Sequence, residues 1–412
     1  MAAAVAVTLT VAGATTARAG GNQTSIVDGA GQVGTDAYVV LLEDTAGVDR
    51  ALTKAQDAYG ATVDNVYRSA IKGYSARLTP AEARALAHAP GVQAVRPDIR
   101  FEIAAQRMPT GINRANAERS PRAGINGRDR RVNVDVAVID TGVDLDHPDL
   151  NVYRRGSKDC SATGVGANDQ NGHGTHVAGT IGALDNRTGV VGMAPGARIW
   201  PVRVFGRSGA GSLAEVICGV DYVTAHAGQI EVANMSLSSV GGRDDGKCGN
   251  EVGDPLHQAI CASVAAGVTY VVAAGNWGRD AALSSPSSYD EVITVSALAD
   301  FNGRPGGGAR ATCRPDRDDT FADFSNYGAD VDLVAPGVCI RSTWRNGGYS
   351  SISGTSMASP HVAGGAALYL ARHPAASPQG VRSALVRSGS SAWNSGDDGD
   401  ATREPLLDVA GF

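Results

Sequence analysis

From Arg131 onward, apolar runs of strand length alternate with longer segments typical of helices. The strand-like runs cover residues 132–140, 197–205, 231–237, 268–276 and 291–297, and the helix-like segments cover 174–184, 213–226 and 256–267. This alternation predicts a doubly wound, mostly parallel α/β sheet with helices on both faces. In such a sheet the ligand crevice lies at the carboxyl ends of the strands, so we expect functional residues there.

A smaller unit precedes this sheet. Its strand-like runs are Tyr38–Leu42, Tyr67–Leu78 with a turn at Gly73, and 92–95, and its first helix-like segment is Val48–Tyr59. A second helix begins after Thr79, which has the N-cap position of a capping box, with Pro80 first in the helix. The order β-α-β-β-α-β predicts a ferredoxin-like α+β domain over residues 36–104.

Two further segments have distinctive compositions. Residues 1–19 have an apolar core followed by Ala17-Arg18-Ala19, which is typical of a secretory signal peptide cleaved after Ala19. Residues 105–130 are rich in Gly, Pro, Asn and Arg, and we expect them to form a linker that contains the mature N-terminus. No later segment has the uninterrupted apolar length of a membrane span. We therefore predict an exported protein.

The net charge limits the possible binding partners, and the cysteine content indicates the cellular compartment. The net charge of -6 argues against a nucleic-acid or acidic-membrane partner, since both select basic surfaces, and we expect a monomer. The 6 cysteines agree with an oxidising compartment. They allow 15 connectivities. We prefer Cys248–Cys261 and Cys313–Cys339, which leaves Cys160 with Cys218.

Ser356 raises the question of a nucleophile. It stands in "SGTSMASPHVAG", ahead of a segment that is apolar or Gly on every face and therefore predicts a buried helix. Pro360 fits such a helix in its first turn, which would place Ser356 at the helix N-terminus. A serine there can simply cap the helix. It also meets free N–H groups and the positive end of the helix dipole, where an oxyanion is stabilised.

Three other polar residues lie at predicted strand ends or helix starts. Asp140 ends the strand "VAVID", His173 lies in "NGHGTHVAGT", and Asn276 ends "VVAAGN". Each has an ordinary structural role in isolation, as a turn or capping residue. Together they supply what a serine nucleophile needs, which is a base, a carboxylate to orient that base, and an amide to bind the oxyanion.

These four motifs, in the order Asp, His, Asn, Ser, resemble those of the subtilisin-like serine proteases, particularly the branch that includes proteinase K. The resemblance covers roughly residues 130–395. It implies that Asp140 orients His173, that His173 is general base and then acid, that Ser356 is the nucleophile, and that Asn276 lies in the oxyanion hole. It also implies that residues 36–104 are an inhibitory propeptide, that 131–412 form the catalytic domain, and that the protein is a self-cleaving zymogen.

The same resemblance implies further site residues. Gly209, Ala210 and Gly211, with Ser236, Leu237 and Ser238, would form two edges that pair with an extended peptide substrate. Asp332 would bind a structural calcium ion, with backbone carbonyls near Asp290 and Val292 as co-ligands. Residues 300–320 depart from the short connection of the family.

Other classes of protein fit the sequence less well. His173 and His176 form an H-x-x-H pair, but a zinc hydrolase needs a third ligand. An α/β-hydrolase would have G-x-S-x-G, and a dinucleotide-binding domain would have G-x-G-x-x-G after a strand. An inactive relative that only binds peptides is the alternative outside the enzymes, although all four catalytic positions are filled.

Overall fold

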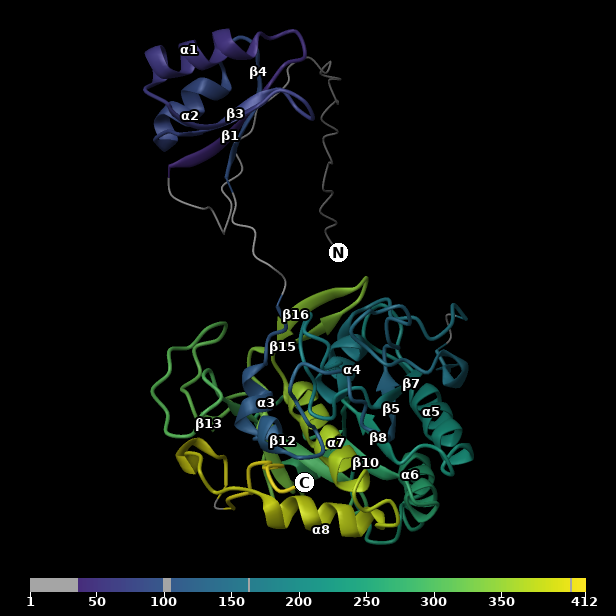
Figure 1. Ribbon diagram of the computed structural model, residues 1–412. Coiled ribbons are helices and arrows are strands. Elements are labelled where there is room, and N and C mark those ends of the chain that lie inside the picture. Colours follow the sequence, from purple (N-terminus) through teal and green to yellow (C-terminus); the bar gives the residue numbers. More distant parts are fainter. Residues whose placement is uncertain (1–35, 99–104, 162–163, 401) are drawn as a thin grey trace, which may run out of the picture. The chain divides into compact units, whose positions relative to one another are not determined.

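The computed structural model describes residues 36–98, 105–161, 164–400 and 402–412 (Figure 1). The chain divides into two units between Ile103 and Ala104, which we call the N-terminal and the C-terminal unit. The predicted signal peptide and residues 99–104 lie outside the described residues. No helix of the described residues is long and apolar enough to cross a bilayer.

The N-terminal unit has the predicted ferredoxin-like order. Its antiparallel sheet has the strand order β2-β3-β1-β4. The elements are β1 (Ala37–Leu42), α1 (Val48–Tyr59), β2 (Thr62–Tyr67), β3 (Gly73–Arg77), α2 (Pro80–Ala87) and β4 (Val92–Pro97). These elements enclose a hydrophobic core of their own.

Local signals account for most of this unit. Thr79 and Glu82 form the predicted capping box at the start of α2. Strand β2 begins at Thr62, before the strand-like run predicted from Tyr67. Most β2 side chains are exposed, so this strand has no apolar alternation that would reveal it.

The C-terminal unit is built on one large sheet with the strand order β13-β12-β10-β8-β5-β7-β6, and β14 also pairs with β12. The strands are β5 (Asp135–Asp140), β6 (Lys158–Asp159), β7 (Arg198–Arg203), β8 (Val232–Met235), β10 (Thr269–Ala273), β12 (Ile293–Ala299), β13 (Thr320–Phe321) and β14 (Leu333–Pro336). Only the β12–β13 pairing is antiparallel among these strands of the described chain. The predicted doubly wound, mostly parallel sheet is confirmed.

Two separate hydrophobic cores cover the two faces of this sheet. Side chains alternate across a strand, and in β5 Val136 and Val138 join one core while Ala137 and Ile139 join the other. The first core contains α4 (His173–Gly182) and α7 (Thr355–Leu370), and the second contains α5 (Leu213–Ala225) and α6 (Pro255–Ala265) (Figure 1).

The centre of the sheet is a topological switch point. Strand β5 pairs in parallel with β7 on one side and with β8 on the other. Later strands of the chain are therefore added to the sheet on both sides of β5. A crevice opens at the carboxyl ends of such strands. Asp140, the last residue of β5, lies at this crevice.

The remaining elements are short or peripheral. They are α3 (Thr110–Arg114), η1 (Ala117–Arg119), η2 (Arg154–Gly156), β9 (Ser239–Val240), η3 (Ala281–Leu283), β11 (Ser284–Ser285), β15 (Ile340–Trp344), β16 (Gly348–Ile352), α8 (Pro378–Ser388) and η4 (Ser395–Asp397). β15 and β16 form an antiparallel hairpin, and β9 pairs with β11.

Residues 105–130 are part of the C-terminal unit and do not form the free linker that their composition predicts. Ile112 and Ala117 are buried in the first core. Arg114 is buried as well, and its guanidinium lies 3.0 Å from Asp300 and 2.7 Å from Asp319. The Gly, Pro and Asn residues permit tight turns here, and the few apolar side chains make long-range contacts that composition does not reveal.

All three preferred disulfides are present, Cys160–Cys218, Cys248–Cys261 and Cys313–Cys339. Cys313 lies in the 300–320 insertion and Cys339 lies directly before β15. The insertion is therefore held to the C-terminal unit covalently.

The buried charge of Arg114 predicts a large effect on stability. Arg114→Ala would leave Asp300 and Asp319 without their cation, and we expect the free energy of unfolding to fall by about 3–5 kcal/mol. Thermal unfolding of the Ser356→Ala chain, which prevents self-digestion, measures this. Arg119→Ala is the control, because Arg119 is exposed. Equal unfolding temperatures for the two variants would contradict the contact.

Candidate active site

Asp140 and His173 are in direct contact. His173 Nδ1 lies 2.8 Å from Oδ1 and 2.9 Å from Oδ2 of Asp140. The Asp140 side chain is fully buried, whereas 27% of the His173 side chain is exposed. The carboxylate accepts a hydrogen bond from Nδ1–H, which leaves Nε2 as the basic nitrogen on the exposed side of the ring.

Two glycines allow the chain to pack closely around this contact. A Cβ at Gly174 would lie 2.1 Å from the carbonyl oxygen of Gly142 and 3.1 Å from Asp140 Cβ. A Cβ at Gly142, where φ is 92°, would lie 2.3 Å from the carbonyl oxygen of Ala167. The glycines that follow Asp140 and His173 in the two motifs are therefore required by packing.

Asp169 holds the start of α4, a role that the sequence analysis missed. Its Oδ1 accepts from the backbone N–H groups of Asn171 and Gly172 and from the Thr141 hydroxyl. Its Oδ2 accepts from the N–H of Thr175 at 3.0 Å and from its hydroxyl. Asp169 lies three residues before Gly172, the N-cap of α4, and therefore outside the position where Asp is a recognised helix signal.

The Asp140 carboxylate also sets the proton affinity of the histidine. Burial opposes the charged imidazolium, but the charge of Asp140 and its hydrogen bond outweigh burial and raise the pKa of His173 above its usual 6.5. Asp169 adds to the rise. His173 is therefore a stronger base than a free imidazole.

Ser356 is the second residue of α7, where a backbone N–H has no acceptor within the helix. The sequence analysis placed Pro360 in the first turn of this helix, which is wrong, because Pro360 lies further inside α7. Because proline has no N–H, the Ser356 carbonyl lacks its helical partner. The Ser236 hydroxyl donates to this carbonyl at 2.8 Å instead, and the Ser356 hydroxyl donates to the Ser236 carbonyl at 3.3 Å.

Asn276 is fixed by the residue before the serine. Its Oδ1 accepts from the Thr355 N–H at 2.8 Å and from the Thr355 hydroxyl at 3.0 Å. The Thr355 hydroxyl oxygen in turn accepts from the Gly275 N–H. Since Oδ1 is occupied, Nδ2 is the end of the amide that is available to a ligand.

One pocket brings two of the predicted catalytic side chains together with parts of both predicted substrate edges. His173, Ser356, Gly209 and 236–238 line a common pocket. A second pocket of about 450 Å³ lies between 209–211 and 237–238. The first edge is exposed, and neither edge belongs to a helix or strand.

A buried carboxylate that contacts a histidine, a serine at a helix N-terminus in the same pocket and an anchored amide together define a serine hydrolase. The chain belongs to the subtilase family, whose model matches residues 132–404, and a model described as "Peptidase inhibitor I9" matches residues 38–104. The protein is a serine endopeptidase with an N-terminal inhibitor domain. The proteinase K branch is a finer placement than these two matches give.

Relatives and a solved structure agree with this family. Subtilisin DY of Bacillus licheniformis is 38% identical over 297 residues, which is 71% of this chain and 94% of the relative. An extracellular serine proteinase of Thermus sp. (strain Rt41A) is 37% identical over 335 residues, which is 79% of this chain and 73% of the relative. The crystal structure of a cold adapted subtilisin-like serine proteinase matches with a TM-score of 0.55 and 32% identity, covering 73% of this chain and 97% of that chain.

His176 does not share the cleft with His173. It is fully buried, its Nε2 lies 2.8 Å from the carbonyl oxygen of Ile340, and burial lowers its pKa to about 3. The H-x-x-H pair therefore cannot present both rings to one ion, which removes the zinc-hydrolase alternative.

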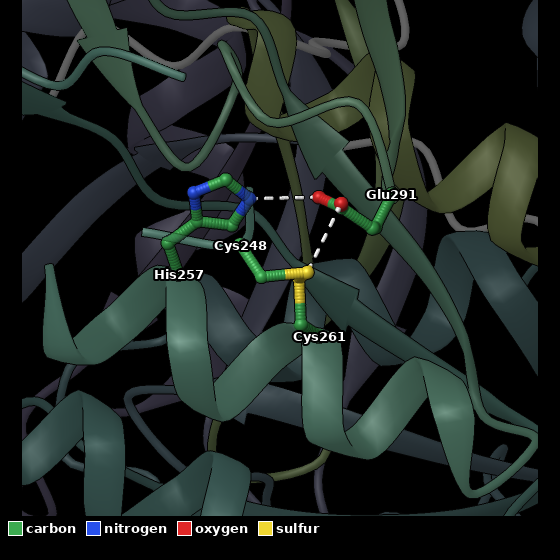
Figure 2. A group of neighbouring side chains, drawn as sticks. All are labelled: Cys248, His257, Cys261 and Glu291. Atoms are coloured by element: carbon green, nitrogen blue, oxygen red, sulfur yellow. Dashed lines mark hydrogen bonds and ion pairs between the residues drawn. A yellow bond between two sulfur atoms is a disulfide. The ribbon is translucent and has the colours of Figure 1, made fainter. Parts of the chain in front are cut away.

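A second histidine–carboxylate pair lies outside the cleft (Figure 2). The fully buried His257 has Nε2 2.8 Å from Glu291, and the nearby Cys248 and Cys261 form a disulfide. The sulfur atoms cannot act as thiolate nucleophiles or metal ligands in this state. This cluster joins α6 to the segment before β12.

The predicted calcium residues meet a different cation. Asp332 and Asp290 lie together, and Val292 is buried directly before β12. The Arg382 guanidinium donates from Nε to Asp332 Oδ1 at 2.6 Å and from Nη1 to the Asp290 carbonyl at 2.6 Å. Two of the three predicted calcium ligands, Asp332 and the Asp290 carbonyl, therefore already bind the Arg382 guanidinium. The residues as arranged do not fit a calcium ion.

The Asp140–His173 contact predicts the pH dependence of the enzyme. His173 acts as a base only when neutral, so kcat/KM should fall as the pH drops through its raised pKa. Asp140→Asn should move this acidic limb to lower pH and reduce kcat by about 10⁴-fold. The rate of peptide hydrolysis from about pH 5 to 9 measures both effects. An acidic limb that does not move in Asp140→Asn would show that Asp140 does not raise the pKa of His173.

The anchored amide predicts a specific kinetic loss. Asn276→Ala should lower kcat by about 10²–10³-fold with little change in KM, a magnitude taken from removal of such a donor in subtilisin itself. Steady-state kinetics on a peptide substrate test this. A loss confined to KM would show that the amide binds the ground state instead.

Proposed function

We propose that Ser356, His173, Asp140 and Asn276 carry out peptide hydrolysis through an acyl-enzyme. Ser356 Oγ attacks the substrate carbonyl carbon while His173 Nε2 accepts the hydroxyl proton. Asp140 holds the tautomer and stabilises the imidazolium. The observation that carries this proposal is the contact between the buried Asp140 and His173 in the pocket that Ser356 lines.

The oxyanion of the tetrahedral intermediate would bind the Ser356 N–H and Asn276 Nδ2. His173 then gives its proton to the leaving amine, and the C–N bond breaks to leave an ester on Ser356. Water attacks the ester with His173 again as base, and the acid product leaves with the serine hydroxyl restored. For this attack the Ser356 hydroxyl must turn from the Ser236 carbonyl towards His173.

We further propose that an extended peptide binds between the edges 209–211 and 236–238 through main-chain hydrogen bonds. The pocket beside Ser356 is lined by Leu237, Ala273, Gly275 and Trp277 among others. The pocket between the edges contains Phe205, Leu213 and Leu256. These linings support a broad preference for apolar substrate side chains.

Secretion and self-activation complete the proposal. The predicted signal peptide and the three disulfides support export, and the Thermus relative is named as extracellular. The match of 38–104 to an inhibitor model supports a zymogen. Gln106 donates from its amide to the carbonyls of Leu184 and Val190, and Arg107 N–H donates to Gly189. We expect cleavage between Ile103 and Met108, so these contacts tie the cleavage segment itself to the C-terminal unit.

Self-cleavage gives the decisive test. The wild-type precursor should be cut between Ile103 and Met108, yielding a shorter mature chain and a separate N-terminal fragment. The Ser356→Ala precursor should fold but stay joined. Mass spectrometry of both proteins, expressed in a protease-deficient host, measures this. Normal cleavage in the Ser356→Ala protein would refute both the nucleophile and the zymogen.

A further inference from the structure

The neighbourhood of Asp332 requires a cation. Asp332 directly precedes β14, its side chain is only 8% exposed, and its Oδ2 accepts from the Thr294 N–H at 2.9 Å. A carboxylate buried to this extent needs a compensating charge. The Asp290 carbonyl faces the same space, because both oxygens contact one guanidinium.

A further acidic group lies beside this position. The N–H of Asp290 donates to the Asp244 carboxylate at 2.7 Å. Carboxylates and backbone carbonyls are the ligands that calcium prefers in proteins. The donor set is therefore suitable for calcium in its chemistry, and the arginine is what excludes the ion.

Arg382 comes from an element remote in sequence. It lies in α8, whose buried residues are Val381, Ala384 and Leu385, and its side chain is 26% exposed. Its planar fork reaches Asp332 with Nε and Nη2 and the Asp290 carbonyl with Nη1. A guanidinium stays protonated at any pH that the protein tolerates.

We propose that the Arg382 guanidinium takes the place of a structural calcium ion, joining α8 to the start of β14 and to the segment before β12. The stabilisation that a bound ion gives to a fold depends on the free concentration of the ion, because the ion can dissociate. A covalently attached cation cannot dissociate. The stability of this part of the fold is therefore independent of calcium.

Removing the arginine tests the proposal in the full chain carrying Ser356→Ala. Arg382→Ala should lower the apparent Tm by about 5 °C in chelator, and millimolar calcium should restore most of the loss. The chain with Arg382 intact should gain less from calcium than the variant does. Arg387→Ala, an exposed arginine on the same helix, is the matched control and should behave like the parent. This readout does not depend on activity.

Calcium titration calorimetry gives a second measurement. Arg382→Ala should bind one more calcium ion than the parent, and Asp332→Asn added to it should abolish that ion. Arg382→Gln serves if Arg382→Ala folds poorly or not at all. It keeps much of the side-chain length without the charge and should show the same additional ion.

Three results would overturn the proposal. One is an unchanged Tm in Arg382→Ala, and another is a lowered Tm that calcium does not restore. The third is a parent chain that itself loses one bound calcium ion through Asp332→Asn, because Asp332 would then hold an ion beside the arginine.

Discussion

The hydrogen bond between Asp140 and His173 is the contact on which the rest of the site depends. It joins the end of a buried strand to the first turn of a helix, and the helix can approach the strand end this closely because Gly174 carries no side chain. The Asp169 carboxylate fixes the helix start by accepting hydrogen bonds from Thr141, which follows β5, and from Thr175 in α4. The proton affinity of His173 thus depends on how closely the backbone packs at the switch point of the sheet.

The serine side of the site is arranged by a defect in a helix. Pro360 takes a donor away from the first turns of α7, and Ser236, directly after β8, supplies one to the Ser356 carbonyl. Asn234 in β8 links Ser236 to Ser359, so strand and helix share a buried polar network next to Ser356. A network with every partner present favours one arrangement over the alternatives.

Local patterns were sufficient to predict the sheet and the helices beside it, and to single out four polar residues at strand ends and helix starts, because periodicity and strand ends are local properties. The exposed strand β2 and the buried segment around Ile112 gave no such pattern, since their places depend on distant contacts. The family resemblance led to Asp332 as a calcium ligand and gave no hint of Arg382. The two are 50 positions apart in sequence, and only the fold brings them together.

The 300–320 insertion bears on how a protease withstands other copies of itself. Proteolysis of this kind requires an exposed segment to extend and to offer its backbone N–H groups to the edges of another active site. Here the N–H groups of Gly306 and Gly307 already donate to Asp319, and that of Ala309 donates to Asp318. Cys313 adds a covalent tie to the body of the enzyme. Much of the loop is exposed to solvent, yet these ties hold its backbone away from the extended form that another active site requires.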